Sequence, residues 1–231
     1  MKAAPGARSW MAAGVRHELL TRALPALRHD MAAPVSVIRM GLLVLKRQMA
    51  GAVEPDAAGW SERLSLIEDQ VALLASGVHS LRAWELSAVD EDISRSELVA
   101  QCTALMRVAF ELNGIGLLVA EELSPEKDER RYPAGAALRY MFLGALGYLH
   151  DSAPATGEIS IEAQGGDGLR LSARPGEAEP GDPLAGVHRA PRALAIDAIA
   201  LQSLADALGY AVEVDPESVR FALAPASSAT A

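Results

Sequence analysis

Apolar residues recur at spacings of three and four along the first part of the chain, a pattern that predicts one long amphipathic helix. We expect this helix to begin near Ser9 or Val15, to end near Gln48 and to be kinked at Pro25 and Pro34, because proline removes a backbone donor and crowds the preceding turn. The apolar stripe consists of Leu20, Leu24, Leu27, Met31, Val35, Ile38, Leu42, Leu45 and Met49.

A second apolar stripe, which alternates spacings of four and three, predicts a second helix that begins near Asp56 as its N-cap. It consists of Trp60, Leu64, Ile67, Val71, Leu74, Val78 and Leu81. The loop at 50–55 makes the two helices a hairpin. Two helices alone bury little apolar surface, so a long seam on each favours pairing with a second copy in a four-helix bundle. We therefore expect a homodimer through residues 9–87.

The helical pattern breaks at 87–92, and Ser94-Arg95-Ser96-Glu97 is typical of a capping box that opens a new helix. From there the sequence predicts a helix 94–112, a strand 116–120, a charged loop 121–133, a helix 134–150, a β-hairpin of 158–163 and 169–173, a Pro/Gly/acid-rich segment 175–192, a helix 193–208 ended by Gly209, strands 211–214 and 219–223, and a disordered tail 224–231. The expected fold class is α+β. A helical hairpin domain at 9–88 precedes an α/β sandwich at 94–225, with helices on one face of a mostly antiparallel sheet.

Composition is consistent with a globular protein that acts away from membranes. Half of the residues are apolar, and no apolar run approaches the roughly 20 residues that span a bilayer. Residues 1–15 lack the continuous apolar stretch of a signal peptide, so we expect a cytoplasmic location and no membrane partner. The single cysteine, Cys102, falls in an apolar helical pattern and is expected to be a buried structural thiol.

The net charge of −9 is unevenly distributed, since residues 1–49 carry +6 and the remainder −15. A basic helix can bind nucleic acid, but the acidic remainder would repel a polyanion and no aromatic pattern suited to base stacking accompanies the basic residues. We therefore expect no nucleic-acid partner. An acidic protein partner fits the basic helix, although ordinary solvated charges explain it equally well.

His29 is the candidate for chemistry, because it lies on the outer face of the first helix. It is two residues from both Leu27 and Met31, so at about 100° per residue it points away from the apolar stripe. Ala32 and Ala33 follow on the same surface and are too small to shield the ring. A partner could therefore approach the imidazole closely.

The segment His29-Asp30-Met31-Ala32-Ala33-Pro34, on a helical hairpin ahead of this α/β order, resembles the two-component histidine kinase superfamily. In that family the histidine is phosphorylated, the adjoining acid assists proton handling and the proline bends the helix. The resemblance implies these roles for His29, Asp30 and Pro34, and it implies a Bergerat-type ATP-binding sandwich for the second domain.

The second domain departs from the family pattern where nucleotide chemistry occurs. Residues 138–149 resemble the N-box helix, but Gly144 and Tyr148 stand where its asparagines hold Mg²⁺. The segment 173–177 replaces the Asp-x-Gly-x-Gly box, and 190–195 lacks the glycines of a phosphate-binding lid. We therefore expect a degenerate domain, with no nucleotide or other cofactor and no ATP-dependent kinase activity.

A dimeric kinase-like protein that keeps the histidine but has lost the nucleotide site is similar to the ChpT-like histidine phosphotransferases. The resemblance implies a phosphorelay role, in which receiver domains of response regulators or hybrid kinases exchange phosphoryl groups through His29 and supply the only Mg²⁺. Ala33, where phosphatases of the family carry threonine or asparagine, favours transfer over hydrolysis. The expected receiver contacts are Arg22, Arg28, Ala32, Ala33, Arg39 and Lys46. Two alternatives stay open: a non-catalytic pseudokinase adaptor, and an active kinase with an unusual nucleotide site.

Overall fold

The structure, a computed structural model, describes residues 5–51, 57–82, 84, 86, 92–152, 156–176 and 194–226. The chain forms two compact units, one of Leu24–Ala88 and one of Met1–Ala23 together with Val89–Ala231. The expected domains began at residues 9 and 94, whereas here the first 23 residues group with the α/β unit. The expected Pro/Gly/acid-rich segment and the end of the expected disordered tail lie largely outside the described residues.

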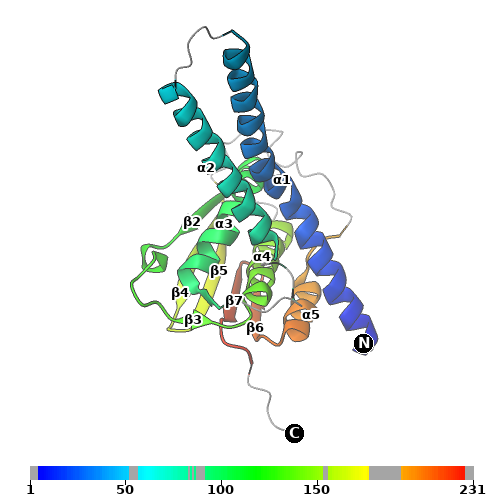
Figure 1. Cartoon of the computed structure of the whole chain (residues 1–231). Coiled ribbons are helices and arrows are strands. Elements are labelled where there is room, and N and C mark those ends of the chain that lie inside the picture. The colour runs from blue at the N-terminus through cyan, green and yellow to red at the C-terminus, as the bar shows by residue number, and fades with distance from the viewer. Residues whose placement is uncertain are drawn as a thin grey trace. The chain divides into compact units, whose positions relative to one another are not determined.

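The first unit is an antiparallel pair of helices. It contains the second part of α1 (Pro5–Gly51) and all of α2 (Ala57–Arg82) (Figure 1). Helix α1 starts at Pro5, before both predicted positions, and continues through Pro25 and Pro34. Met31 lies beside Gly77, and Gly41 lies beside Ile67. These contacts fix which turns of the two helices face each other.

In its described residues, the α/β unit contains a mixed sheet, four helical segments of its own and the first part of α1. Its strands are β1 (Ile93–Ser94), β2 (Gly116–Val119), β3 (Arg131–Tyr132), β4 (Thr156–Gln164), β5 (Gly168–Pro175), β6 (Val212–Asp215) and β7 (Ser218–Ala222). Its helices are α3 (Arg95–Glu111), η1 (Glu121–Leu123), α4 (Gly135–Ser152) and α5 (Ala198–Leu208), to which the first part of α1 is added. The element order confirms the predicted α+β class, with helices on one face of the sheet (Figure 1).

Five strands form the main sheet in the order β2-β4-β5-β7-β6, and β1 and β3 form a separate pair. Only β2 is parallel to its neighbour; the other main-sheet pairs are antiparallel, as expected. Side chains alternate across the strands. Ile159, Ile161, Leu169, Leu171 and Val219 are buried on the helix side of the sheet. The opposite face carries polar residues, so the core lies between the sheet and the helices.

Local signals explain where two of the helices begin. The predicted capping box is present: the Ser94 hydroxyl accepts from the Glu97 N–H, and the Glu97 carboxylate accepts from the Ser94 N–H. Helix α5 begins after Asp197, whose carboxylate accepts from the Ala200 N–H, rather than at residue 193. It ends as predicted at Gly209, whose φ of 79° suits glycine.

Candidate functional site

His29 lies on α1 in the hairpin unit, and its side chain is 83% exposed. The carboxylate of Asp30 is also exposed, and its Oδ1 lies 3.6 Å from His29 Nδ1. That distance is longer than a normal hydrogen bond, so the contact is mainly electrostatic. The imidazole therefore has one nitrogen near an anion and the other open to a partner.

The turn that follows His29 leaves space around the ring. Ala32 and Ala33 are both exposed and present only methyl groups beside it. Pro34 is buried, and because it has no N–H it cannot donate to the carbonyl of Asp30 in the same turn. The arrangement matches the expectation of an unshielded histidine on the outer face of the helix.

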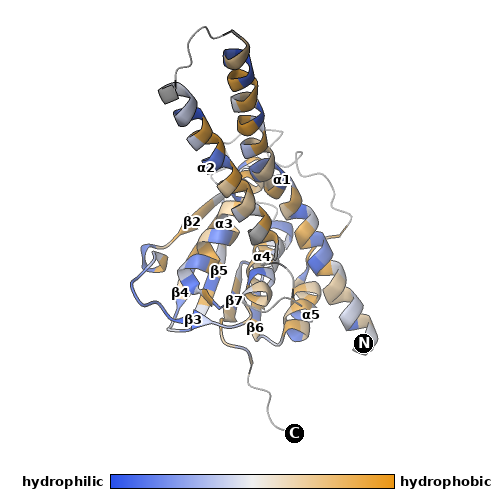
Figure 2. Ribbon diagram, viewed as in Figure 1, coloured by the Kyte–Doolittle hydropathy of each residue, from blue (hydrophilic) through white to orange (hydrophobic). Residues whose placement is uncertain are grey.

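The two apolar stripes of the hairpin each divide into an inner seam and an exposed row. Along α1 the inner seam includes Met31, Ile38 and Leu45, and along α2 it includes Trp60, Ile67 and Leu74; none of these is exposed. The exposed rows are Val35, Leu42 and Met49 on α1 and Leu64, Val71 and Val78 on α2. Figure 2 shows apolar positions along both helices of the hairpin. The sequence pattern treated each stripe as one buried surface.

The exposed rows lie on the same flank of the hairpin. In each helix the exposed residue directly follows a partly buried position, as Leu42 follows Gly41 and Val71 follows Gln70. In an antiparallel helix pair, the residues that come one position after the inward-facing ones lie on the same side of the pair in both helices. The hairpin unit thus carries one continuous apolar face in addition to its internal seam.

Three of the four predicted basic contacts are exposed on one side of α1. At 100° per residue, Arg28, Arg39 and Lys46 all lie within about 80° to 100° of His29 in the same rotational direction. Two residues that the sequence reading missed, Met40 and Leu43, lie almost directly in line with His29 and are 63% and 50% exposed. Counting rotation from His29, rather than from the apolar stripe, would have found them.

Arg22 has a different environment from the other basic residues. It belongs to the α/β unit, where its Nη2 donates to Asp151 Oδ2 at 2.8 Å and to the Leu194 carbonyl at 2.9 Å. Its Nε donates to Glu18 Oε1 at 2.8 Å, and only 9% of the side chain is exposed. The guanidinium is thus paired with groups of the protein itself. We therefore leave Arg22 out of the receiver-contact surface.

Asp151 is the centre of this buried ionic cluster. Burial by itself raises the pKa of a carboxyl group, but hydrogen bonds from His150, from Arg22 and from the Ile196 N–H, together with the charge of Arg22, lower the pKa of Asp151 to about 2. His150 Nδ1 lies 3.0 Å from Asp151 Oδ1, and the His150 ring packs edge-on against Phe110. The cluster joins α1, α4 and the segment before α5.

The face of α4 on which the resemblance places metal-binding asparagines is filled by side chains of α1, of α5 and of the segment before α5. A Cβ on Gly144 would lie 2.8 Å from a methyl carbon of Leu204, and one on Gly147 would lie 2.7 Å from Ile196 Cδ1. The side chain of Leu19, from α1, approaches both glycines. Tyr148 is buried, and its hydroxyl donates to the Asp215 carbonyl at 3.1 Å. These positions therefore serve packing.

The segment that replaces the Asp-x-Gly-x-Gly box also has a structural role in its described part. Ala173 is buried in β5, and Arg174 pairs with Glu158 across the sheet at 3.7 Å. Gly176 packs against the backbone of Gly157. Glu177 and the segment 190–193 lie outside the described residues.

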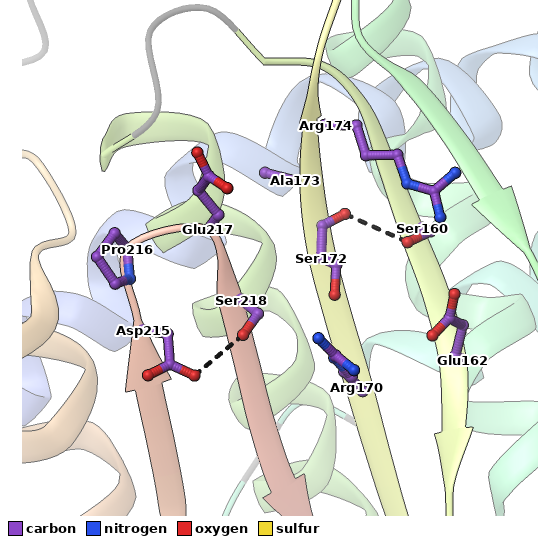
Figure 3. Close-up of a pocket in the computed structure, with 10 residues that line it drawn as sticks. All are labelled: Ser160, Glu162, Arg170, Ser172, Ala173, Arg174, Asp215, Pro216, Glu217 and Ser218. Carbon is purple, nitrogen blue, oxygen red and sulfur yellow. Dashed lines mark hydrogen bonds between the residues drawn. The ribbon is translucent and has the colours of Figure 1, made fainter.

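The polar face of the sheet holds a shallow pocket of about 690 Å³ (Figure 3). Its floor is a row of hydroxyls on adjacent strands, in which Ser160 pairs with Ser172 and Ser172 pairs with Ser218. Charged residues of both signs surround the row: Glu162, Arg170, Arg174, Asp215 and Glu217. The mixture of charges favours no single class of ligand.

Other candidate chemistry is limited in the described part of the chain. Cys102 is buried as predicted, and burial raises the pKa of its thiol to about 12, so it is an inert thiol. No group of His, Cys, Asp and Glu among the described residues could hold a metal ion. None of the described helices combines the length and apolar character required to cross a membrane.

Comparisons with known proteins return histidine kinases. The cytoplasmic segment of histidine kinase QseC is 11% identical, with a TM-score of 0.37, over 67% of this chain and 92% of that one. The kinase AdeS of Acinetobacter baumannii is 13% identical, with a TM-score of 0.32, over 84% and 98%. Histidine kinase ThkA, solved in complex with the response regulator TrrA, is 15% identical, with a TM-score of 0.32, over 95% of this chain and 66% of that one.

No family model and no curated protein matches the sequence. At these identities and TM-scores, the likeness to the solved structures supports no conclusion about the chemistry of this chain. The functional argument therefore rests on the residues of this chain.

Proposed function

We propose that this protein is a histidine phosphotransferase of two-component signalling, which relays phosphoryl groups between receiver domains through a phosphohistidine at His29. The observation that carries the proposal is the exposure of the His29 imidazole on a helical hairpin, with only methyl groups from Ala32 and Ala33 beside it. The resemblance of the segment 29–34 to the histidine kinase box supports the same role.

The proposed chemistry requires a nucleophile, and the receiver provides the remainder. A neutral imidazole has a lone pair on one ring nitrogen and a proton on the other. The carboxylate of Asp30 favours a proton on Nδ1, which leaves Nε2 to attack. The new P–N bond forms as the P–O bond of the receiver's aspartyl phosphate breaks, and the receiver's carboxylate leaves. The reverse sequence passes the group to a second receiver, and positioning governs both steps.

The surface around His29 suits an acidic, partly apolar partner. Arg28, Arg39 and Lys46 provide positive charge along one side of the helix, and Met40 and Leu43 provide apolar contact in line with the histidine. A receiver carries its acceptor aspartate in an acidic pocket, so opposite charges would steer the encounter. The basic residues would raise the rate of encounter with the receiver. The apolar residues would stabilise the complex once it has formed.

We propose that the protein acts as a homodimer. The exposed rows of Leu42 and Val71 and their neighbours form one apolar flank, and the pairing of two such flanks completes a four-helix bundle. A large exposed apolar face is unusual for a monomer. The second copy would cover it by the same surface, as twofold symmetry requires.

We further propose that the α/β unit binds no nucleotide. Gly144 and Tyr148 lack carboxamides for Mg²⁺, and α1 and α5 occupy the space that longer side chains on this face of α4 would need. His29 must then obtain its phosphoryl group from a receiver. Autophosphorylation with ATP would contradict this part of the proposal.

A relay assay tests the function. A radiolabelled, phosphorylated receiver is mixed with the protein and then with a second, unlabelled receiver. The wild type should take up label and pass it on, and His29→Gln should do neither while it still binds the receiver. His17→Gln is the matched control, because His17 is another exposed histidine on the same helix. Receiver binding without transfer by the wild type would favour the adaptor role instead.

A further inference from the structure

A cavity of about 340 Å³ lies within the α/β unit, where three helices meet. It is lined by Glu18, Leu19 and Arg22 of α1, by Met106, Ala109 and Phe110 of α3, and by Leu143 and Gly147 of α4. Its volume falls in the range of pockets that hold small molecules. The relay chemistry proposed above does not use it.

The cavity wall is apolar except at one end. Leu19, Met106 and Phe110 present hydrocarbon, thioether and aromatic surface, which adapts readily to varied apolar ligands. The polar end is formed by Glu18 and Arg22. A small number of polar groups in an otherwise apolar pocket is the usual arrangement for orienting a bound molecule.

The polar end contains an unsatisfied donor. The Nε and Nη2 atoms of Arg22 have hydrogen-bond partners, but Nη1 is shielded from solvent and has none. Nη1 lies beside Gly147, another residue of the cavity wall: a Cβ on that glycine would be in van der Waals contact with it, at 3.4 Å. A buried donor without an acceptor is unfavourable, so an acceptor supplied at this end would be stabilising.

Charge selects the kind of acceptor. The guanidinium of Arg22 already pairs with two carboxylates, those of Glu18 and Asp151. A further anion would add excess negative charge to a site with little solvent screening. An uncharged oxygen satisfies the free donor without that penalty.

We propose that this cavity binds a small, largely apolar, uncharged molecule that carries a carbonyl oxygen, with the apolar body between α1, α3 and α4 and the oxygen at the Arg22 end. A bound molecule would join the first part of α1 to the two other helices. It would therefore stabilise the α/β unit by mass action. The proposal is independent of phosphotransfer.

The test uses acetanilide, an aryl amide, as the probe and the full-length protein with isotope-labelled methionine methyl groups. The NMR signal of Met106, assigned from Met106→Leu, should shift saturably, and the thermal midpoint should rise. Ala109→Leu narrows the cavity and should weaken binding by about tenfold or more. Ala104→Leu is the matched control, because Ala104 is exposed on the same helix, and it should bind like the wild type.

A second probe isolates the role of Arg22. N-ethylaniline has nearly the shape of acetanilide without the carbonyl, and it should bind about tenfold more weakly if Nη1 takes the oxygen. Equal binding of the two probes would overturn the assignment of the acceptor. Absence of a saturable Met106 shift up to about 20 mM acetanilide, or equal binding by Ala109→Leu and Ala104→Leu, would overturn the site.

Discussion

Replacement of Asp151 by asparagine removes the charge that holds Arg22 to α4, and the structure sets the size of the effect. The carboxyl titrates near 3.8 when unperturbed and at about 2 in the folded protein. Each pKa unit corresponds to about 1.4 kcal/mol, so the charged form of Asp151 contributes about 2 kcal/mol to the free energy of unfolding at pH 7. Asp151→Asn should lower that free energy by this amount.

The sign of the pH dependence follows from the lowered pKa. A carboxyl whose folded-state pKa is depressed stabilises the protein above its unfolded pKa, and the contribution is lost as pH falls toward the folded value. The difference between wild type and Asp151→Asn should therefore be complete at pH 7, about half as large near pH 3 and small at about pH 2.

Urea unfolding followed by near-ultraviolet circular dichroism is a suitable assay, because all four tyrosines lie in the α/β unit. The matched control is Asp206→Asn, since Asp206 pairs with Arg8 at 3.7 Å in a half-exposed ion pair. Such surface pairs contribute at most about 1 kcal/mol. The reasoning fails if the two variants lose equal stability at pH 7, or if the effect of Asp151→Asn does not change with pH.

Three further predictions concern the hairpin, the nucleotide and the receiver. In light scattering, Leu42→Glu should convert the proposed dimer to monomer, because a buried unpaired charge costs several kcal/mol. Met40→Glu, on the outward face, should keep the mass of a dimer, and a dimeric Leu42→Glu would exclude the proposed flank. Calorimetry with ATP and Mg²⁺ should detect no binding, and a micromolar dissociation constant would contradict the degenerate assignment. The affinity for a receiver should fall as salt rises, and Arg39→Gln should reduce that salt dependence, because screening acts on the charge pairs; a salt-independent affinity would rule out charge steering.

The order of elements was predictable from the sequence because its signals are local. The capping box at Ser94, the C-cap at Gly209 and the turn between β4 and β5 each depend on a few neighbouring residues, and each is present. Helix α5 begins after Asp197, later than the predicted residue 193, because the carboxylate of Asp197 caps the first turn. That boundary was therefore available from the sequence.

The packing of the apolar stripes was not predictable to the same degree. Periodicity identifies which residues avoid water. It does not distinguish a residue that faces the other helix of the hairpin from a residue that faces away from the hairpin. Ile38 is on the inner seam, while Leu42, four residues later in the same stripe, is 52% exposed. The difference depends on helix pairing, which is a tertiary property.

Arg22 is a predicted site residue whose environment also could not be predicted from local sequence. Its spacing and charge placed it with the other basic residues of α1, but its partner Asp151 is 129 positions away in the sequence. Likewise, the sequence pattern indicates lost ligands at Gly144 and Tyr148. Only the packing of Gly144 against Leu19 and Leu204, and the hydrogen bond from Tyr148 to the Asp215 carbonyl, reveal their structural role. Interactions across such separations are absent from local patterns.

The central claim is that a phosphoryl group resides on His29 during transfer. Incubation with a phosphorylated receiver, digestion under mild alkaline conditions and mass spectrometry would map the acid-labile phosphate directly. The account predicts a single modified peptide that contains His29, with the modification lost in His29→Gln and retained in His17→Gln. Phosphate on another residue, or a phosphorylated receiver that decays without ever labelling His29, would contradict the account.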